Sequence, residues 1–256
     1  MTDKKYVLTD DTIKVGEQTL YRIEALRDFA NIKKGDKGGY IRADYNLSHK
    51  GDCWVYDNAK VYDYARIFGN ARAFNNAEVY DDAIVFGSSC VVDNSRVFGD
   101  AQIFGDARIC SNAKIFGKAS IYGFARIGSR AQIYDEAAIT GNAIIIDDTK
   151  ICGESYITDN SIIGGHSIID GEMNIRGYAS IYDAEVNSAS DYIVFNSWWS
   201  DGHYFTWTRS NNMWNVGRFH GIGEELIAKA YKESELSGRE YERVVRYVES
   251  IYEQTK

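Results

Sequence analysis

A six-residue repeat occupies almost half of this 256-residue chain. Every sixth residue of the range 59–179 is small, with Met173 as the one large exception, and this makes 21 copies without an insertion. The residue two places later is Val or Ile throughout 61–181, except for Ala73. The residues between each aliphatic position and the next small position are rich in Gly, Asp and Asn, which accept the left-handed backbone of a corner. A short strand followed by a corner, repeated at this period, is typical of a parallel β-helix.

One coil of such a helix has three strands and three corners, so it takes about 18 residues. The 21 copies then form seven coils, a prism about 34 Å long if adjacent coils lie ~4.8 Å apart. The small positions continue backward to Leu47 and Cys53, which places the start of an irregular first coil near Tyr40. The residues on either side of each interior aliphatic point outward, so residues one coil apart form columns along the outside of the prism.

The repeat resembles the hexapeptide motif of left-handed β-helix proteins from bacteria and phages, which are often labelled putative acyltransferases. The residues that carry the resemblance are Gly38-Gly39-Tyr40-Ile41, Asn46-Leu47-Ser48-His49, the stretch 51–59 and the hexads that follow. The resemblance implies a left-handed coil over about 40–185. For an enzyme of this family it also implies a His general base, an acyl-CoA between coils of adjacent subunits, and a loop that interrupts the repeat to form the pocket. The 21 copies in this chain contain no such loop.

The repeat divides the chain into three expected parts. Residues 1–39 alternate apolar residues with Asp and Gly turns, which indicates a β meander that caps the first coil. Residues 40–186 form the left-handed parallel β-helix. Residues 191–256 differ in composition and predict a small α+β domain, which resembles small domains of phage and prophage proteins. The predicted fold class is therefore mainly β, with a C-terminal α+β domain.

The C-terminal domain is expected to contain three short strands followed by two helices. Alternating apolar residues separated by Ser, Asp, Gly and Asn turns predict strands at 192–195, 203–208 and 213–219. A first helix begins at Gly223. The sequence Ser237-Gly-Arg-Glu240 has the form of a capping box and predicts the start of a second helix, which continues to about Tyr252.

The charge and cysteine content of the chain exclude some functions. Lys and Arg number 29 against 37 Asp and Glu, so the net charge of −8 argues against nucleic acid as a bulk partner. The four cysteines form no CxxC pair and no metal-ligand spacing, which favours reduced thiols in the cytoplasm. No apolar stretch predicts a signal peptide or a membrane span. We therefore expect a cytoplasmic protein (in the host cell if it is phage-encoded) without a cofactor, metal or membrane partner.

Two groups of aromatic residues are candidate binding surfaces. One outward column of the prism is Phe68, Phe86, Phe104 and Tyr122, and the column beside it is largely uncharged. We expect this face to meet a second subunit or the C-terminal domain, although stacked aromatics also support a sheet without any partner. The C-terminal domain contains four tryptophans, which either fill a small core or form a recognition surface. They are Trp198, Trp199, Trp207 and Trp214.

Catalytic residues are scarce. A general base must reach the proton that it removes, and His166 at an ordinary corner is the one weak candidate. The leading hypothesis is therefore a non-enzymatic, homo-oligomeric scaffold that binds a protein. A phage-encoded inhibitor of a host nucleic-acid-targeting defence system, similar to an anti-CRISPR protein, would place this acidic surface against a basic channel. The alternatives are a hexapeptide-repeat acyltransferase that uses acyl-CoA and a structural protein that assembles with itself.

Overall fold

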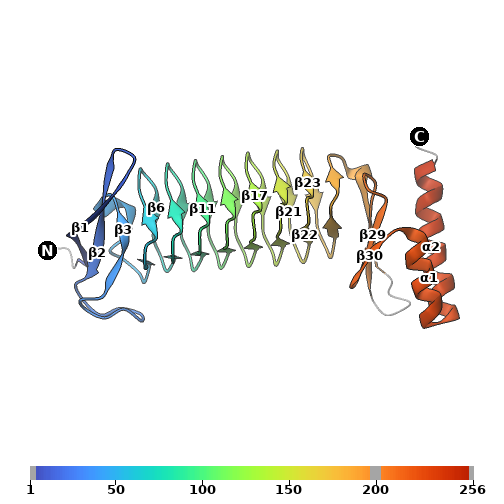
Figure 1. The fold of residues 1–256 in the computed structure, drawn as a ribbon, viewed down its shortest axis with the longest axis horizontal. Coiled ribbons are helices and arrows are strands. Elements are labelled where there is room, and N and C mark those ends of the chain that lie inside the picture. The colour runs from blue at the N-terminus through green and yellow to red at the C-terminus, as the bar shows by residue number, and fades with distance from the viewer. Residues whose placement is uncertain (1–3, 197–202, 254–256) are drawn as a thin grey trace.

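The chain folds into a long rod with a different cap at each end (Figure 1). The computed structural model describes residues 4–196 and 203–253. N-terminal strands form one cap, short strands stack along the middle, and a small sheet with two helices forms the other cap. The middle is a parallel β-solenoid of about eight turns at about 18 residues per turn. This confirms the predicted fold class.

Three parallel sheets form the walls of the solenoid, and each successive strand of a wall lies one coil further along. The first wall is built from β3 (Lys37–Ile41), β5 (Lys60–Val61), β8 (Glu78–Val79), β11 (Arg96–Val97), β14 (Lys114–Ile115), β17 (Gln132–Ile133), β20 (Lys150–Ile151), β23 (Ile168–Ile169) and β26 (Glu185–Val186). The second wall contains β6 (Arg66–Ile67), β9 (Ile84–Val85), β12 (Gln102–Ile103), β15 (Ser120–Ile121), β18 (Ala138–Ile139), β21 (Tyr156–Ile157) and β24 (Asn174–Ile175). The third contains β4 (Trp54–Val55), β7 (Arg72–Ala73), β10 (Cys90–Val91), β13 (Arg108–Ile109), β16 (Arg126–Ile127), β19 (Ile144–Ile145), β22 (Ile162–Gly164) and β25 (Ser180–Tyr182).

The interior of the solenoid contains the two positions that the repeat marks. Every small residue of the range 59–179 and every aliphatic residue of 61–181 is buried. The buried Ser and Thr among them keep their hydroxyls satisfied by local bonds: Ser95 Oγ donates to the carbonyl of Val92 at 2.6 Å, and Thr149 Oγ1 donates to that of Ile146 at 2.7 Å. A buried hydroxyl without a partner would be costly. The repeat therefore accepts Ser and Thr in place of Ala.

The corners explain why the repeat is rich in Asp. Asp81 and Asp93 have φ angles of 54° and 62°, in the left-handed region. Their carboxylates accept the backbone N–H of the equivalent corner residue in the next coil, from Gly99 at 3.0 Å and from Ser111 at 2.9 Å. These bonds offset the cost of the left-handed backbone for a residue that has a side chain. Many acidic side chains thus stabilise corners.

The N-terminal cap is a hairpin that extends the first wall. β1 (Tyr6–Val15) pairs antiparallel with β2 (Gln18–Ala25), and β2 pairs antiparallel with β3. β3 then pairs in parallel with β5, so the hairpin continues into the solenoid. A short 3-10 helix, η1 (Asp44–Asn46), leads into the irregular first coil. The hairpin thereby covers the edge of β3, and β1 becomes the edge strand of this sheet.

The C-terminal cap is a four-stranded antiparallel sheet with helices on one face. The sheet follows a 3-10 turn, η2 (Ala189–Asp191), and the two helices follow the sheet. One strand more is present than the sequence predicted, because the stretch 213–219 is divided by a turn at Gly217, whose φ is 57°. The elements are β27 (Tyr192–Asn196), β28 (Tyr204–Thr208), β29 (Met213–Val216), β30 (Phe219–Gly221), α1 (Gly223–Glu233) and α2 (Glu235–Glu253).

The start of α2 also differs from the prediction. The helix begins at Glu235, so Ser237 lies in its first turn rather than at its cap. Ser234 is the capping residue, since its Oγ accepts the backbone N–H of Ser237 at 3.0 Å. The helix buries an apolar stripe, in which Tyr241, Val245 and Val248 pack against the sheet. In the described part of the chain, neither helix is long and apolar enough to cross a membrane.

Candidate functional sites on the solenoid wall and in the C-terminal domain

The second aromatic ladder (Phe68, Phe86, Phe104 and Tyr122) is a continuous stack on the second wall. Adjacent ring centroids are 5.1, 4.9 and 4.8 Å apart, with interplanar angles between 1° and 10°. Each ring therefore covers much of its neighbours, and Phe68 at the end of the stack is the most exposed member, at 38%. The column beside the ladder carries one charge in five residues, at Arg66. Self-stacking thus explains the regularity of the ladder and leaves its outer edges apolar.

The first aromatic ladder differs in its surroundings. It consists of Tyr62, Tyr80, Phe98, Phe116 and Tyr134, with ring centroids 4.9–5.0 Å apart. The β1–β2 hairpin packs on its N-terminal end through Leu20, which contacts Tyr62 within one apolar cluster. Beside it, Glu78 forms ion pairs with Lys60 at 2.8 Å and with Arg96 at 3.3 Å. The first ladder is therefore partly covered and bordered by charge, unlike the second.

The C-terminal domain docks on the end of the solenoid. The backbone N–H of Ser180 donates to Thr206 Oγ1 at 2.9 Å, and that of Glu185 donates to Ser210 Oγ at 2.8 Å. The ring of Tyr178 stacks on that of Tyr204 at 4.3 Å. All of these contacts lie in the last coil, several coils beyond the second ladder. The C-terminal domain is therefore not the partner of the second ladder. A second subunit, the other expected partner, remains a prediction.

The tryptophans of the C-terminal domain occupy its core where they are described. Trp207 and Trp214 are 3% and 1% exposed, between the sheet and the two helices. The Trp207 ring meets that of Tyr252 edge-on at 5.4 Å, and its Nε1 donates to Asn212 Oδ1 at 2.9 Å. As placed, neither indole is available to a partner at the surface. Trp198 and Trp199 lie outside the described residues.

His166 lies on an exposed corner next to two carboxylates. Its Nδ1 is 3.2 Å from Asp183 Oδ1 and its Nε2 is 3.7 Å from Asp148 Oδ2. The backbone N–H of His166 holds the pKa of Asp183 below its usual range, and the guanidinium of Arg130 does the same for Asp148. An oriented His is the arrangement of a general base. However, the side chain of His166 is 81% exposed, and it lines neither the cavity beside α1 nor the groove between the second and third walls.

The other candidate ligands and nucleophiles have structural surroundings. His49 stacks on Tyr6 at 4.3 Å, and its Nδ1 accepts the backbone N–H of Lys5. The Lys5 ammonium is buried against the carbonyl and sulfur of Cys53, at 2.7 and 3.2 Å. Burial lowers the pKa of Lys5 and raises that of Cys53. Within the described ranges, no three His, Cys, Asp or Glu side chains come together in a way that could hold a metal ion.

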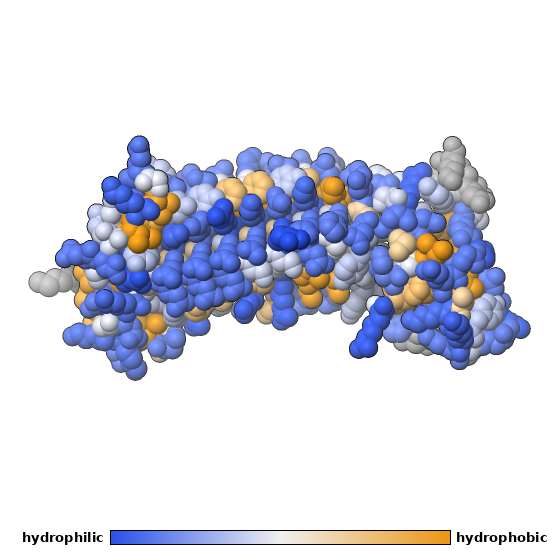
Figure 2. Space-filling view, viewed as in Figure 1, coloured by the Kyte–Doolittle hydropathy of each residue, from blue (hydrophilic) through white to orange (hydrophobic). Residues whose placement is uncertain are grey.

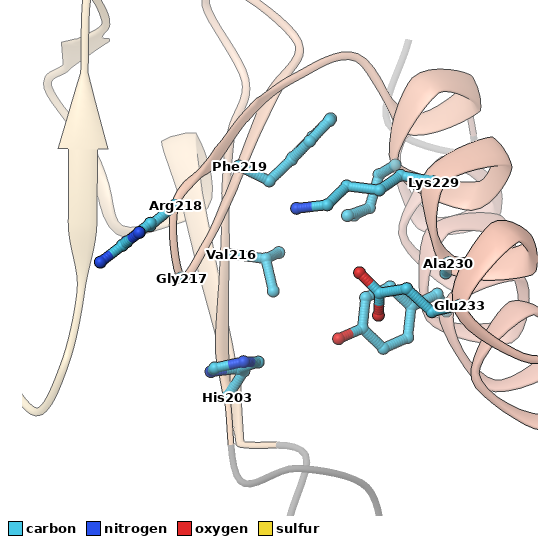
Figure 3. A pocket seen from close by; sticks show the side chains of 10 residues that line it. His203, Val216, Gly217, Arg218, Phe219, Lys229, Ala230 and Glu233 are labelled. Carbon is cyan, nitrogen blue, oxygen red and sulfur yellow. The ribbon is translucent and has the colours of Figure 1, made fainter.

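A cavity of about 300 Å³ lies between the C-terminal sheet and α1 (Figure 3). Its apolar floor includes Val216, Leu226 and Tyr241. The side chains of Lys229 and Glu233 reach into the space from α1 (Figure 3), and the Lys229 ammonium lies 5.5 Å from the centre of the Phe219 ring. This cavity was not predicted from the sequence. The sequence does contain a signal for it, because Lys229 and Glu233 are one helical turn apart on α1, next to the buried Leu226 and Ala230.

A groove of about 470 Å³ runs along the corner between the second and third walls. The side of the rod in Figure 2 is largely hydrophilic along the solenoid, with separate apolar spots. The groove is lined by Phe124, Arg126, Asn142, Ile144, Asn160, Ile162 and Tyr178. This groove was not predicted from the sequence either, although its residues follow the same 18-residue spacing.

The repeat and the solenoid together define a hexapeptide-repeat β-helix protein. No protein-family model matches the chain. A stretch of 54 residues, 21% of the chain, is 41% identical to the uncharacterized acetyltransferase YdcK of Escherichia coli (strain K12). That stretch spans 17% of the length of YdcK, so the chain matches less than a fifth of this relative.

Proposed function

We propose that the protein is a non-enzymatic scaffold that binds a protein partner on its second aromatic ladder. The observation that carries this proposal is the ladder itself: a rigid row of rings with apolar edges on a wall where charged neighbours are rare. Burial of such edges against a partner contributes about 25 cal/mol per Å² of apolar surface. Stacking already holds the rings of the ladder in place, so little side-chain entropy is lost on binding. A second copy of the chain is the first partner to test.

Double substitution of Phe86 and Phe104 by Glu tests the ladder. Because two charges would have to be buried, we expect the self-associated form to dissociate to monomers in multi-angle light scattering. The matched control is the same substitution of Phe98 and Phe116 on the first ladder, whose rings stack at the same spacing. An equal loss of mass in both variants would contradict the assignment. If the wild-type chain is monomeric, self-association is wrong, and the same variants are then compared for capture of host proteins.

The more specific form of this proposal is an inhibitor of a host nuclease complex. The net charge of −8 supports it, because an acidic rod is attracted to a basic nucleic-acid channel. Tagged protein should then retain a nuclease from host extract, and nucleic acid should compete for it. End-to-end self-assembly is less favoured, because the C-terminal domain is hydrogen-bonded to the last coil and the β1–β2 hairpin extends the first wall beyond β3.

An acyltransferase is the second candidate function. The name of the relative YdcK favours it, together with the orientation of His166 by Asp183. Under the leading proposal, titration with acetyl-CoA in a calorimeter should give no saturable heat. Saturable binding, with transfer to an amine acceptor that is lost in His166→Ala while acetyl-CoA binding persists, would establish the transferase instead.

A further inference from the structure

The groove between the second and third walls has the regular spacing of a polymer-binding site. Phe124, Asn142, Asn160 and Tyr178 follow one another on one corner, each one coil further along the rod. Beside them run the outward residues of β16, β19 and β22, which pair in register: Arg126 with Ile144, and Ile144 with Ile162. The groove therefore spans three coil spacings along the axis, roughly 14 Å at ~4.8 Å per coil.

The lining offers ring faces at both ends and amides between them. Phe124 is 61% exposed and Tyr178 is 49% exposed, and Tyr178 is braced by its stack on Tyr204. Asn142 Nδ2 donates to Asn160 Oδ1 at 3.2 Å. Among the described residues, this leaves Asn142 Oδ1 as an acceptor and Asn160 Nδ2 as a donor without further partners. Aromatic faces that pack on C–H groups, with amides for neighbouring hydroxyls, suit a sugar ring.

The charge of the groove points to an anion. The protein as a whole carries a net charge of −8, yet the groove lining contains one charged residue, Arg126, and no carboxylate. Arg126 lies directly beside Arg108 of the adjacent strand. Neither guanidinium has an ion-pair partner in the described part of the chain. Like charges that face each other across paired strands are destabilising. A bound anion would neutralise this pair.

The distance between adjacent coils favours a glycan over a peptide as the ligand of this groove. Adjacent coils are ~4.8 Å apart, which is close to the length of a pyranose unit in a linear chain, so sugars of one chain can lie over successive coils. An extended peptide repeats its side-chain direction every two residues, about 6.7 Å, and would fall out of register within the groove. We propose that this groove binds a linear acidic glycan, with Phe124 and Tyr178 stacking on terminal sugars and Arg126 pairing with a uronate carboxylate.

Titration of the full-length protein with an oligomannuronate tetramer tests this site. The neutral manno-oligosaccharide of the same length is the matched ligand, because it carries a hydroxymethyl group in place of each carboxylate. We expect saturable binding of the acidic tetramer, and binding roughly tenfold weaker in Arg126→Gln, which loses a charge-assisted bond. The neutral tetramer should bind more weakly than the acidic one and be insensitive to Arg126→Gln. Phe124→Ala should weaken both ligands.

Arg66→Gln is the control variant, because Arg66 is also exposed and outward-facing but lies on the second wall. It should bind the tetramer like the wild type. The proposal is overturned if the tetramer does not bind, if Arg66→Gln and Arg126→Gln lose the same affinity, or if an oligoglutamate peptide binds as tightly as the glycan. The double variant Phe86→Glu, Phe104→Glu should retain glycan binding, so this test and the test of the protein-binding proposal can fail separately.

Discussion

Replacement of Ile115 by Ala should lower the free energy of unfolding by about 2–5 kcal/mol. Ile115 is fully buried on β14, in register between Val97 of β11 and Ile133 of β17. The coils are fixed to one another by backbone hydrogen bonds on all three walls, so the interior cannot collapse into the cavity that the substitution leaves. The loss should therefore lie toward the upper part of this range.

Urea unfolding followed by circular dichroism measures this effect. The control is Lys114→Ala, because Lys114 is the outward neighbour of Ile115 on the same strand, and we expect a change of less than about 0.5 kcal/mol. Tryptophan fluorescence reports mainly on the C-terminal domain, so the two probes together show whether the domain unfolds with the solenoid. Equal losses in Ile115→Ala and Lys114→Ala would contradict the interior placement.

The second large effect is expected at a corner. Gly105 has a φ angle of 67°, and a Cβ atom there would lie 2.9 Å from the backbone nitrogen of Gly123 in the next coil. Val at this position would combine a left-handed backbone, which a β-branched residue strongly disfavours, with a clash between coils. We expect Gly105→Val to lose about 2–4 kcal/mol of unfolding free energy.

Gly16→Val separates the two causes. Gly16 has a φ of 57°, but nothing lies within 4 Å of a Cβ placed there. This variant should lose only the strain, about 1–2 kcal/mol. Thermal or urea unfolding of both variants gives the difference, which is the cost of the clash between stacked corners. If Gly16→Val were as destabilising as Gly105→Val, the close approach of adjacent coils would not contribute to the loss of unfolding free energy.

The sequence predicted the solenoid well because one physical environment recurs at every coil. The interior accepts a small residue and an aliphatic residue at fixed positions, and the corner accepts Gly, Asp or Asn. The hydrogen bond from Gly99 to the carboxylate of Asp81 was not foreseen, since it joins residues of different coils. It gives the corner aspartates a structural role in addition to their tolerance of the left-handed backbone.

Prediction was poorer in the C-terminal domain, because its sequence has no repeat and each local pattern occurs only once. The stretch 213–219 has the composition of one strand, but Gly217 turns it into two. Ser237 and Glu240 have the spacing of a capping box, yet Ser234 caps the helix. Trp207 and Trp214 fit equally well in a core or on a surface by composition. Their burial depends on two helices that pack on one face of the sheet.

By itself, the sequence determined the architecture of this protein, because the period of small and aliphatic residues is imposed by the interior of each coil. It also determined which residues form outward columns, since the strand alternation fixes their direction. Only the tertiary structure decided which columns remain open. The hairpin covers part of the first ladder, and the C-terminal sheet ends the rod beside Tyr178. The groove between Phe124 and Tyr178 forms only because successive coils stack, and this stacking places Arg126, which has no ion-pair partner among the described residues, in its lining.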